Sequence, residues 1–443
     1  MTVRQHPTVV KIKKRLGQVP QSPPVLEADW LRRTCLELGA DDVGFVEVGR
    51  QELSDERPFV EAALPGVQTL ISFVIRTNPD AIRSPKRSVS NQEFQASDDE
   101  ITAVGRRICE SLSERGARAI NTALGFPMEL NDYPRRTWVV GHKTVAVAAG
   151  LGAMGIHRCI IHPRFGNFIL LGTIVTDARV TAPTVPIDYN PCLECKLCVA
   201  ACPVGAIKVD DDFDFSACYN HNYREFMTGF TSFTEELVEA KNKLDLRKRV
   251  SDRESISMWQ SLSFGASYKA GYCVAACPAG EDVLGPFLRD RKEFLNQVVR
   301  PLQRKNETVY VVPGSDAESH VLRRFPHKTV QRVPSSLRAD SADSFLETMP
   351  LVFQREPSRH REARYHFIFR GDEELEATVH LDHGVLQVSR CLVGKADVRI
   401  EADSATWVAF VAGNKKLWWA LLTGRIRIRG RIKLMKLFAR SFP

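Results

Sequence analysis

The stretch PCLECKLCVAACPVGAI, residues 191–207, sets four cysteines in the pattern C-x-x-C-x-x-C-x-x-x-C-P. With this spacing, three thiolates curl around one iron–sulfur cluster and the fourth reaches across to a second cluster. The stretch alone completes neither site. The remaining ligands must therefore come from elsewhere in the chain.

A partial repeat of the motif, YCVAACPAGEDVLGP, occupies residues 272–286 and supplies only the C-x-x-x-C-P ending. By the logic of two-cluster ferredoxins, the cysteine before the proline completes the first cluster. A zinc ion would accept four cysteines as well, but the C-x-x-x-C-P ending favours the cluster. We therefore expect a 4Fe–4S cluster on Cys192, Cys195, Cys198 and Cys277.

The second cluster has an incomplete set of cysteines. Its expected ligands are Cys202, Cys273 and, from FDFSACYNHNY, Cys218. The regular motif would place two more cysteines where the sequence has Ser267 and Ala270. A 3Fe–4S cluster, a 4Fe–4S cluster with a non-cysteine ligand and a degenerate site all stay open. The non-cysteine candidates are His221, Tyr268 and Tyr272, and the other cysteines, expected to be ordinary buried side chains, are Cys35, Cys109, Cys159 and Cys391.

Composition is that of a soluble globular protein, with 443 residues, 44% apolar and 26% charged. No run of about 18 apolar residues suggests a membrane span, and the basic N-terminus lacks the apolar region of a signal peptide. The cytoplasm is therefore the expected location. Because disulfides are rare in the cytosol, the clustered cysteines indicate metal ligands. The basic stretch 421–443 could contact an acidic partner, but a solvated strand followed by a helix is the simpler interpretation.

Hydrophobic patterning divides the chain. Helices are expected over 27–40 and 98–117 and strands over 41–48, 69–77 and 167–177, and this alternation predicts an α/β domain. The expected parts are an N-terminal extension (1–25), an α/β cofactor-binding domain (26–187), a ferredoxin-like α+β iron–sulfur domain (188–300), a βαβ-like connector and linker (301–344) and an α+β domain (345–443).

Residues 26–290 resemble the cobalamin-dependent epoxyqueuosine reductase and reductive dehalogenase superfamily. The resemblance rests on ELGADDVGFVEV, ALPGVQTLISFVIRT, HKTVAVAAGLGAMGIHRCIIHPRFGNFILLGTIVTD and the cysteine segment. It implies a nitroreductase-like fold that binds cobalamin and is fused to a two-cluster ferredoxin domain. It also implies a reductase to which a donor such as ferredoxin or flavodoxin delivers electrons through 4Fe–4S centres to cobalt.

In that family the glycine-rich segment lies against the corrinoid. Glycines let the backbone approach a large flat cofactor without interference from side chains. A helix C-cap and close helix packing explain at least one of Gly150 and Gly152 equally well. The residues expected to shape the cofactor pocket are Gly150, Gly152, Gly155, His162, Arg164 and Gly166.

A reductive step also needs a proton. Arg136 stands where the family has an acidic proton donor, and Asp132 lies four residues earlier. His142 titrates near neutrality and the pKa of Lys143 would fall on burial, so either is a candidate general acid, with Tyr133 and Asp132 in reserve. The alternative for His142 and Lys143 is a solvated first turn of a helix.

Residues 345–443 resemble the sterol carrier protein type 2 family, which folds around an apolar tunnel. The resemblance rests on ELEATVHLDHGVLQVSR and on residues 395–442. It implies a hydrophobic ligand or substrate, and nucleic acid is not expected because no helical-repeat tail for tRNA is evident. The alternatives are a non-catalytic electron-transfer or lipid-binding protein and a flavin-dependent reductase. The residues that would line the tunnel, or simply form its core, are Trp407, Trp418, Trp419, Leu434, Met435 and Phe438.

Overall fold

The structure is a computed structural model that describes residues 3–13, 23–131, 133, 136–210, 212–269 and 271–443. Asp132 and Ala270 thus lie outside the described residues. Two short helices, η1 (Val3–Gln5) and α1 (Pro7–Lys13), precede the first domain-sized unit. Within the described residues, no helix combines the length and the apolar character that crossing a membrane would need.

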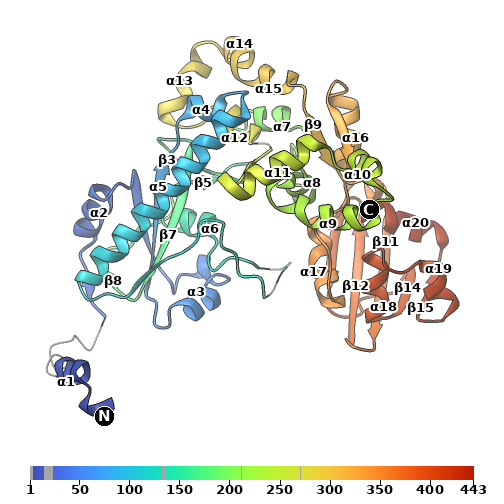
Figure 1. The fold of residues 1–443 in the computed structure, drawn as a ribbon, viewed down its shortest axis with the longest axis horizontal. Coiled ribbons are helices and arrows are strands. Elements are labelled where there is room, and N and C mark those ends of the chain that lie inside the picture. The colour runs from blue at the N-terminus through green and yellow to red at the C-terminus, as the bar shows by residue number, and fades with distance from the viewer. Residues whose placement is uncertain (1–2, 14–22, 132, 134–135, 211, 270) are drawn as a thin grey trace.

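A four-stranded sheet forms the centre of the α/β part (Figure 1). Its order is β2 (Asp42–Glu47), β3 (Thr69–Arg76), β7 (Ile169–Thr176), β4 (Ala119–Asn121), and every pair is antiparallel. Strand side chains alternate between two faces, and both faces of this sheet are buried. Ile71, Phe73 and Ile75 of β3 face one core, whereas Leu70 faces the other.

Helices cover both faces of this sheet. α2 (Ala28–Glu37) and α5 (Arg87–Glu114) pack on one face, while η3 (Gln51–Leu53), α3 (Arg57–Ala63) and α6 (His142–Ala148) pack on the other. The result is the three-layer arrangement that alternating helices and strands predict, but with antiparallel strands. β1 (Val25–Leu26) and β8 (Arg179–Val180) pair in parallel as a separate two-stranded sheet.

The helix expected over 98–117 begins earlier than its expected range. α5 begins at Arg87, because polar side chains in its first turns bind the cysteine-rich segment and need no apolar pattern. α6 ends at Ala148, and Gly150 then takes a left-handed backbone, with φ +75°. The chain continues as the hairpin β5 (Ala153–Met154) to β6 (Ile160–Ile161).

The cysteine-rich segment, residues 188–300, was expected to be α+β, but its described residues form helices and one isolated β-bridge between Ile207 and Phe213. Its two C-x-x-x-C stretches form the short helices α7 (Leu197–Ala201) and α12 (Tyr272–Ala276), which share one apolar core. The insert between them is helical. Its helices are α8 (Phe215–Asn222), η4 (Arg224–Thr228), α9 (Gly229–Glu239), α10 (Lys243–Arg249) and α11 (Asp252–Phe264). α4 (Pro79–Arg83), α13 (Glu281–Arg289), α14 (Arg291–Phe294), η5 (Leu295–Val299) and α15 (Arg300–Arg304) lie beside them at the top of Figure 1.

A βαβ unit follows. β9 (Thr308–Val311) and β10 (Thr329–Arg332) are parallel, joined by α16 (Asp316–Arg324), which matches the strand–helix–strand pattern of residues 307–333.

The last part is a mixed five-stranded sheet with helices. The strand order is β13 (Val385–Ser389), β12 (Leu375–Asp382), β11 (Glu362–Arg370), β14 (Val398–Asp403), β15 (Ile426–Gly430), and only β11 and β14 pair in parallel. Its helices are α17 (Ala342–Val352), η6 (Glu356–Ser358), α18 (Ser404–Val411), α19 (Leu417–Leu422) and α20 (Ile432–Ser441). Phe345, Phe367 and Trp407 stand at the centre of its core.

Candidate functional site

The first set of four cysteines surrounds one small cavity. Cys192, Cys195 and Cys198 reach it from the loop before α7 and from the helix itself, and Cys277 reaches it from the end of α12. Glu194 and Lys196 have positive φ angles, 47° and 61°, which turn the loop tightly between its cysteines. Four thiols around one space are what a 4Fe–4S cluster requires.

A glycine fixes the position of the fourth cysteine. Gly166 has φ +65°, and a Cβ atom there would lie 2.0 Å from the carbonyl oxygen of Ala279. Ala279 comes two residues after Cys277, so the close backbone contact holds this ligand in place. Gly166 therefore acts by packing against the cysteine-rich segment.

In the same stretch, HPRFG (162–166), Arg164 also joins the two parts of the molecule, whereas His162 makes its hydrogen bonds within the α/β part. His162 is buried, accepts the backbone N–H of Arg164 on Nδ1 at 3.1 Å and contacts an Asp42 carboxylate oxygen through Nε2 at 3.1 Å. Arg164 forms an ion pair with Asp282 of α13 at 3.3 Å. Among the described residues, neither side chain lines the large cavity described next.

A cavity of about 1090 Å³ lies between the α/β part and the cysteine-rich segment. Ligand sites often form at such interfaces and have volumes of about 300–1,000 Å³, so this cavity has room for a large cofactor. The α/β part contributes Phe94, Asp98, Asp99, Leu124, Lys143 and Leu170 to its wall. The cysteine-rich segment contributes Tyr219, His221, Tyr223, Tyr268 and Tyr272.

The second set of cysteines is on the wall of this cavity. Cys202 caps α7, Cys218 lies in α8 and Cys273 in α12, and all three line the same space. Burial raises the pKa of the Cys218 thiol to about 12, so a metal has to displace its proton on binding.

Cys159 also lines the cavity, although the sequence indicated an ordinary buried cysteine. It is half-buried in the β5–β6 hairpin, and its sulfur shares a hydrogen bond with Cys273. The expectation of burial is also wrong for Cys391, which is exposed.

Nowhere in the described part of the chain do three or more His, Cys, Asp or Glu side chains converge closely enough to hold a single metal ion. A cluster is broader than an ion, so its ligands surround a space instead of converging on a point. The cysteine arrangement thus suits a cluster better than the zinc ion considered above.

The candidate proton donors have different surroundings. Lys143 lines the large cavity and donates from Nζ to the carbonyl oxygen of Arg158 at 2.6 Å. His142 is buried, and burial lowers its pKa. Its Nδ1 lies 2.9 Å from Thr173 Oγ1, and its Nε2 lies 2.9 Å from the carbonyl oxygen of Ala123. Tyr133 donates to the Ser336 carbonyl oxygen at 3.4 Å.

Arg136, at the position of the family's acid, is used for structure. It forms an ion pair with the buried Glu56 and lies over the ring of Phe59. Sequence reasoning missed Asp98 and Asp99, which bring two carboxylates to the cavity from α5. Burial, and then the charge of Asp99, raises the pKa of Asp98, so this carboxyl group holds its proton more tightly than usual. The sequence signal was a run of three acidic residues, 98–100, at the start of a predicted helix.

The predicted cofactor glycines make room for backbone. A Cβ atom on Gly150 would lie 2.2 Å from the carbonyl oxygen of Val185, and one on Gly152 would lie 2.4 Å from that of Ile161. At Gly155 a Cβ atom would lie 2.8 Å from the ring of His157. None of the three is among the described residues that line the large cavity.

A separate cavity of about 870 Å³ lies between the C-terminal part and residues of α9 and the connector, among them Glu235, Val312 and Leu337. Of the six predicted tunnel residues, Trp407, Met435 and Phe438 line it. Leu434 packs against the core instead, and the side chains of Trp418 and Trp419 are exposed, the former at 62%. The buried Trp407 Nε1 has no hydrogen-bond partner among the described residues, so a bound molecule could accept from it.

Residues 185–208 match the family model of the 4Fe-4S binding domain. The epoxyqueuosine reductase of Vibrio cholerae is 23% identical over 223 residues, covering 44% of this chain and 58% of that protein. The epoxyqueuosine reductase of Lactococcus garvieae is 31% identical over 196 residues, covering 44% of this chain and 53% of that protein. The chain thus spans less than two thirds of the length of these relatives.

Solved structures are less similar. An epoxyqueuosine reductase from Streptococcus thermophilus has 15% identity and a TM-score of 0.33, over 62% of this chain and 78% of that one. A catabolic reductive dehalogenase has 16% identity and a TM-score of 0.38, over 61% and 34%. The sequence matches, and not these weak structural likenesses, carry the relationship. On those matches, part of the chain is similar in sequence to the epoxyqueuosine reductases.

Proposed function

We propose that this chain is an oxidoreductase, an iron–sulfur and cobalamin-dependent reductase. The observation that carries the proposal is the contact between the cavity of about 1090 Å³ and the second set of cysteines. A cofactor in that cavity would lie directly against the second cluster. The match to a 4Fe-4S binding domain and the names of the sequence relatives support the same class of enzyme.

The residues present fit these cofactors. Four thiols surround the first cavity, and the second cavity has the volume and the mixture of aromatic and aliphatic wall that a large ring system needs. Cys192, Cys195, Cys198 and Cys277 would hold one cluster, and Cys202, Cys218 and Cys273 would contribute to the other. When bound, the clusters supply single electrons and the corrinoid supplies a strongly reducing metal centre.

The glycine segment would shape the corrinoid site indirectly in this proposal. Gly152 allows the β5–β6 hairpin to close, and this hairpin carries Arg158 and Cys159 to the cavity wall. Gly166 packs the α/β part against the segment that bears Cys277, and His162 holds the turn before Gly166 by accepting the backbone N–H of Arg164.

Two side chains on the cavity wall would serve as proton donors. Lys143 carries a proton at Nζ, and Asp98 holds a proton at its carboxyl group more tightly than usual because of burial and the neighbouring Asp99. His142 would act by positioning: its two hydrogen bonds fix the first turn of α6, from which Lys143 projects.

Epoxyqueuosine is the first substrate to test, since it is the compound in the names of the relatives. Reduction of an epoxide takes two electrons and two protons, whether an alcohol or an alkene and water results. The electrons would come from an external donor such as ferredoxin or flavodoxin. A hydrophobic small molecule is the second candidate, favoured by the apolar cavity of the C-terminal part.

The decisive experiment is the metal content of the protein after anaerobic expression with cobalamin supplied. We expect about one cobalt and roughly seven or eight irons per chain, followed by turnover of epoxyqueuosine, free or within RNA, with a chemical reductant. Iron near four without cobalt would contradict the proposal. A bound flavin without cobalt would point to the flavin-dependent alternative, which the sequence relatives do not favour.

A further inference from the structure

We propose that Cys159 is the fourth protein ligand of the second iron–sulfur cluster, together with Cys202, Cys218 and Cys273. This inference rests on the proposed function, because it presupposes that a second cluster is present. Four cysteines line the same cavity, and they come from four separate places: the β5–β6 hairpin, the end of α7, α8 and α12.

The thiol of Cys273 lies near those of the other three cysteines. Cys273 shares a hydrogen bond with Cys159 and lies within electrostatic range of Cys159, Cys218 and Cys202. Cys218 in turn is influenced by the charges of Cys202 and Cys159. A 4Fe–4S cluster takes four thiolates, and these four residues provide that number around one space.

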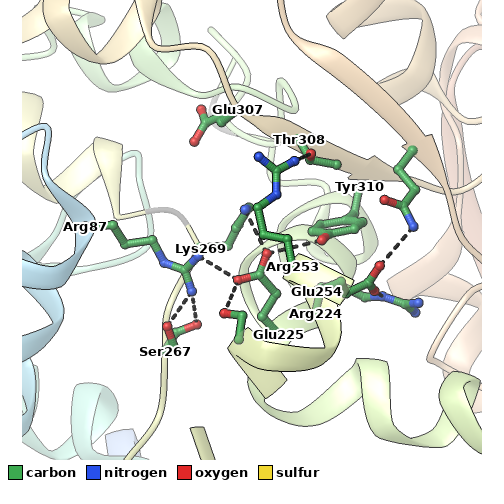
Figure 2. Close-up of polar contacts among 12 residues, drawn as sticks. Arg87, Arg224, Glu225, Arg253, Glu254, Ser267, Lys269, Glu307, Thr308 and Tyr310 are labelled. Carbon is green, nitrogen blue, oxygen red and sulfur yellow. Dashed lines mark hydrogen bonds and ion pairs between the residues drawn. The ribbon is translucent and has the colours of Figure 1, made fainter. Parts of the chain in front are cut away.

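The position that the regular motif would use has another role here. Ser267 accepts hydrogen bonds from Arg87 Nη2 through both Oγ, at 2.5 Å, and its carbonyl oxygen, at 2.7 Å. Figure 2 shows Ser267 turned toward Arg87, which also pairs with Glu225 at 2.7 Å. Position 267 is therefore tied to a buried ionic network, and Ala270 has no side-chain atom that could bind iron.

The non-cysteine candidates are also engaged elsewhere. Tyr272 donates from its hydroxyl to Glu307 at 2.7 Å, and Tyr268 packs edge-on against Phe226. His221 accepts the backbone N–H of Tyr310 on Nδ1 at 3.3 Å. Its Nε2 has no partner among the described residues and lines the same cavity, so His221 is the competitor that the test must address.

The backbone that presents Cys159 is well fixed. Arg158 has φ 61°, a conformation that is uncommon outside glycine and is kept where surrounding contacts impose it. Its N–H donates to Gly155 at 2.9 Å, and its carbonyl oxygen accepts from Lys143 Nζ at 2.6 Å. The N–H of Cys159 donates to His157 Nδ1 at 3.1 Å. The hairpin thus holds a thiol at the cavity wall without a metal.

The assignment has a structural consequence. Cys202, Cys218 and Cys273 belong to the cysteine-rich segment, whereas Cys159 belongs to the α/β part. A cluster on all four would link the two walls of the cavity covalently through iron. A cysteine ligand at position 270 would instead have placed all four ligands in the cysteine-rich segment.

The test compares Cys159→Ser with the matched control Cys109→Ser, which replaces a half-buried cysteine of α5 outside the cavity lining. Iron and acid-labile sulfide per chain are measured in full-length protein purified without oxygen, and electron paramagnetic resonance spectra are recorded. We expect about eight irons in wild type and control. For Cys159→Ser we expect about seven irons with the signal of a 3Fe–4S cluster, or about four with only the first cluster left.

The remaining outcomes separate the alternatives. Retention of about four irons in Cys159→Ser, with unchanged circular dichroism, distinguishes ligand loss from misfolding. Eight irons and an unchanged spectrum in Cys159→Ser would overturn the assignment. If His221→Gln lost one cluster and Cys159→Ser lost none, the fourth ligand would be His221 instead. A Cys159–Cys273 disulfide in iron-loaded wild type would also overturn it. About four irons in wild type would instead contradict the second cluster, and with it the proposed function.

Discussion

Glu225 is the buried carboxylate at the centre of the ionic network that holds the loop before Cys273 (Figure 2). It is 4% exposed and accepts from Arg87 Nη1 at 2.7 Å, Lys269 Nζ at 2.8 Å and Ser257 Oγ at 2.5 Å. The hydroxyl of Tyr310 donates to it as well, at 3.1 Å. We predict that Glu225→Gln strongly destabilises the protein, because it leaves two cations without their anion.

The size of the effect follows from the pKa of this carboxyl group. Burial alone would raise the pKa, but the charges of Arg87 and Lys269 outweigh burial and lower it from 4.5 to about 2. At about 1.4 kcal/mol per pKa unit, this difference corresponds to about 3 kcal/mol of stability. This value agrees with the loss of about 3–5 kcal/mol of stability that generally follows when one partner of a buried ion pair is removed.

Urea denaturation, followed by circular dichroism, measures this loss. With an m-value of about 3 kcal/mol/M, the midpoint of the variant should fall by about 1 M. The control is Glu110→Gln, which breaks an exposed ion pair with Arg106 on α5 and should cost about 0.5 kcal/mol or less. Equal midpoints for the two variants would refute the reasoning.

The pH dependence has a defined sign. A carboxyl group whose pKa is lowered on folding stabilises the protein above its ordinary pKa and loses that contribution as the pH falls toward the folded value. The stability gap between wild type and Glu225→Gln should therefore be constant from pH 8 to about 5.5 and should narrow as pH falls from 4.5 toward 2. A gap that widens in acid would contradict the ion-pair explanation.

Two further predictions concern the first cluster and the C-terminal cavity. Gly166→Ala should lose the first cluster, about four irons per chain, because its Cβ would lie 2.0 Å from the Ala279 carbonyl oxygen. The control Gly285→Ala in α13 should keep all iron, because its Cβ would meet no atom within 4 Å. Trp407→Phe should weaken binding of a fluorescent fatty acid roughly fivefold, the value of one hydrogen bond of about 1 kcal/mol, while Trp418→Phe at the surface should not. Unchanged iron in the first case, or equal affinities in the second, would contradict these assignments.

The first cluster site was predictable because its information is local. Three of its ligands fall within seven consecutive residues, and the fourth is marked by the same C-x-x-x-C-P ending. The left-handed residues Glu194 and Lys196 fold the loop within that short span. The strands β3 and β7 were equally readable, since continuous apolar runs indicate buried strands.

The second site depends on contacts between residues far apart in sequence. Cys159 stands before two isoleucines, so its surroundings in the sequence resemble a core position. Only the hairpin turn at Arg158 and the approach of Cys273 reveal it as part of the cavity. The first half of α5 was missed for a related reason: its helical turns carry polar residues that bind a distant loop, and periodicity reports only apolar faces.

At two positions where the chain departs from the expected pattern, the replacing residue forms a structural contact with a distant residue. Arg136 replaces an acid and Ser267 a cysteine, and each is satisfied by a partner from elsewhere: Glu56 for Arg136, and Arg87 for Ser267. Arg87 lies on α5 of the α/β part, as Cys159 lies on its hairpin, so both contacts at the second cysteine set cross the same interface. If a cluster joins Cys159 to Cys273, then removing iron should loosen that interface while leaving the Arg87 contacts in place. Faster hydrogen exchange in residues 153–161 of the iron-free protein, without a matching increase in residues 87–95, would show that the metal and the ionic network hold the two parts together independently.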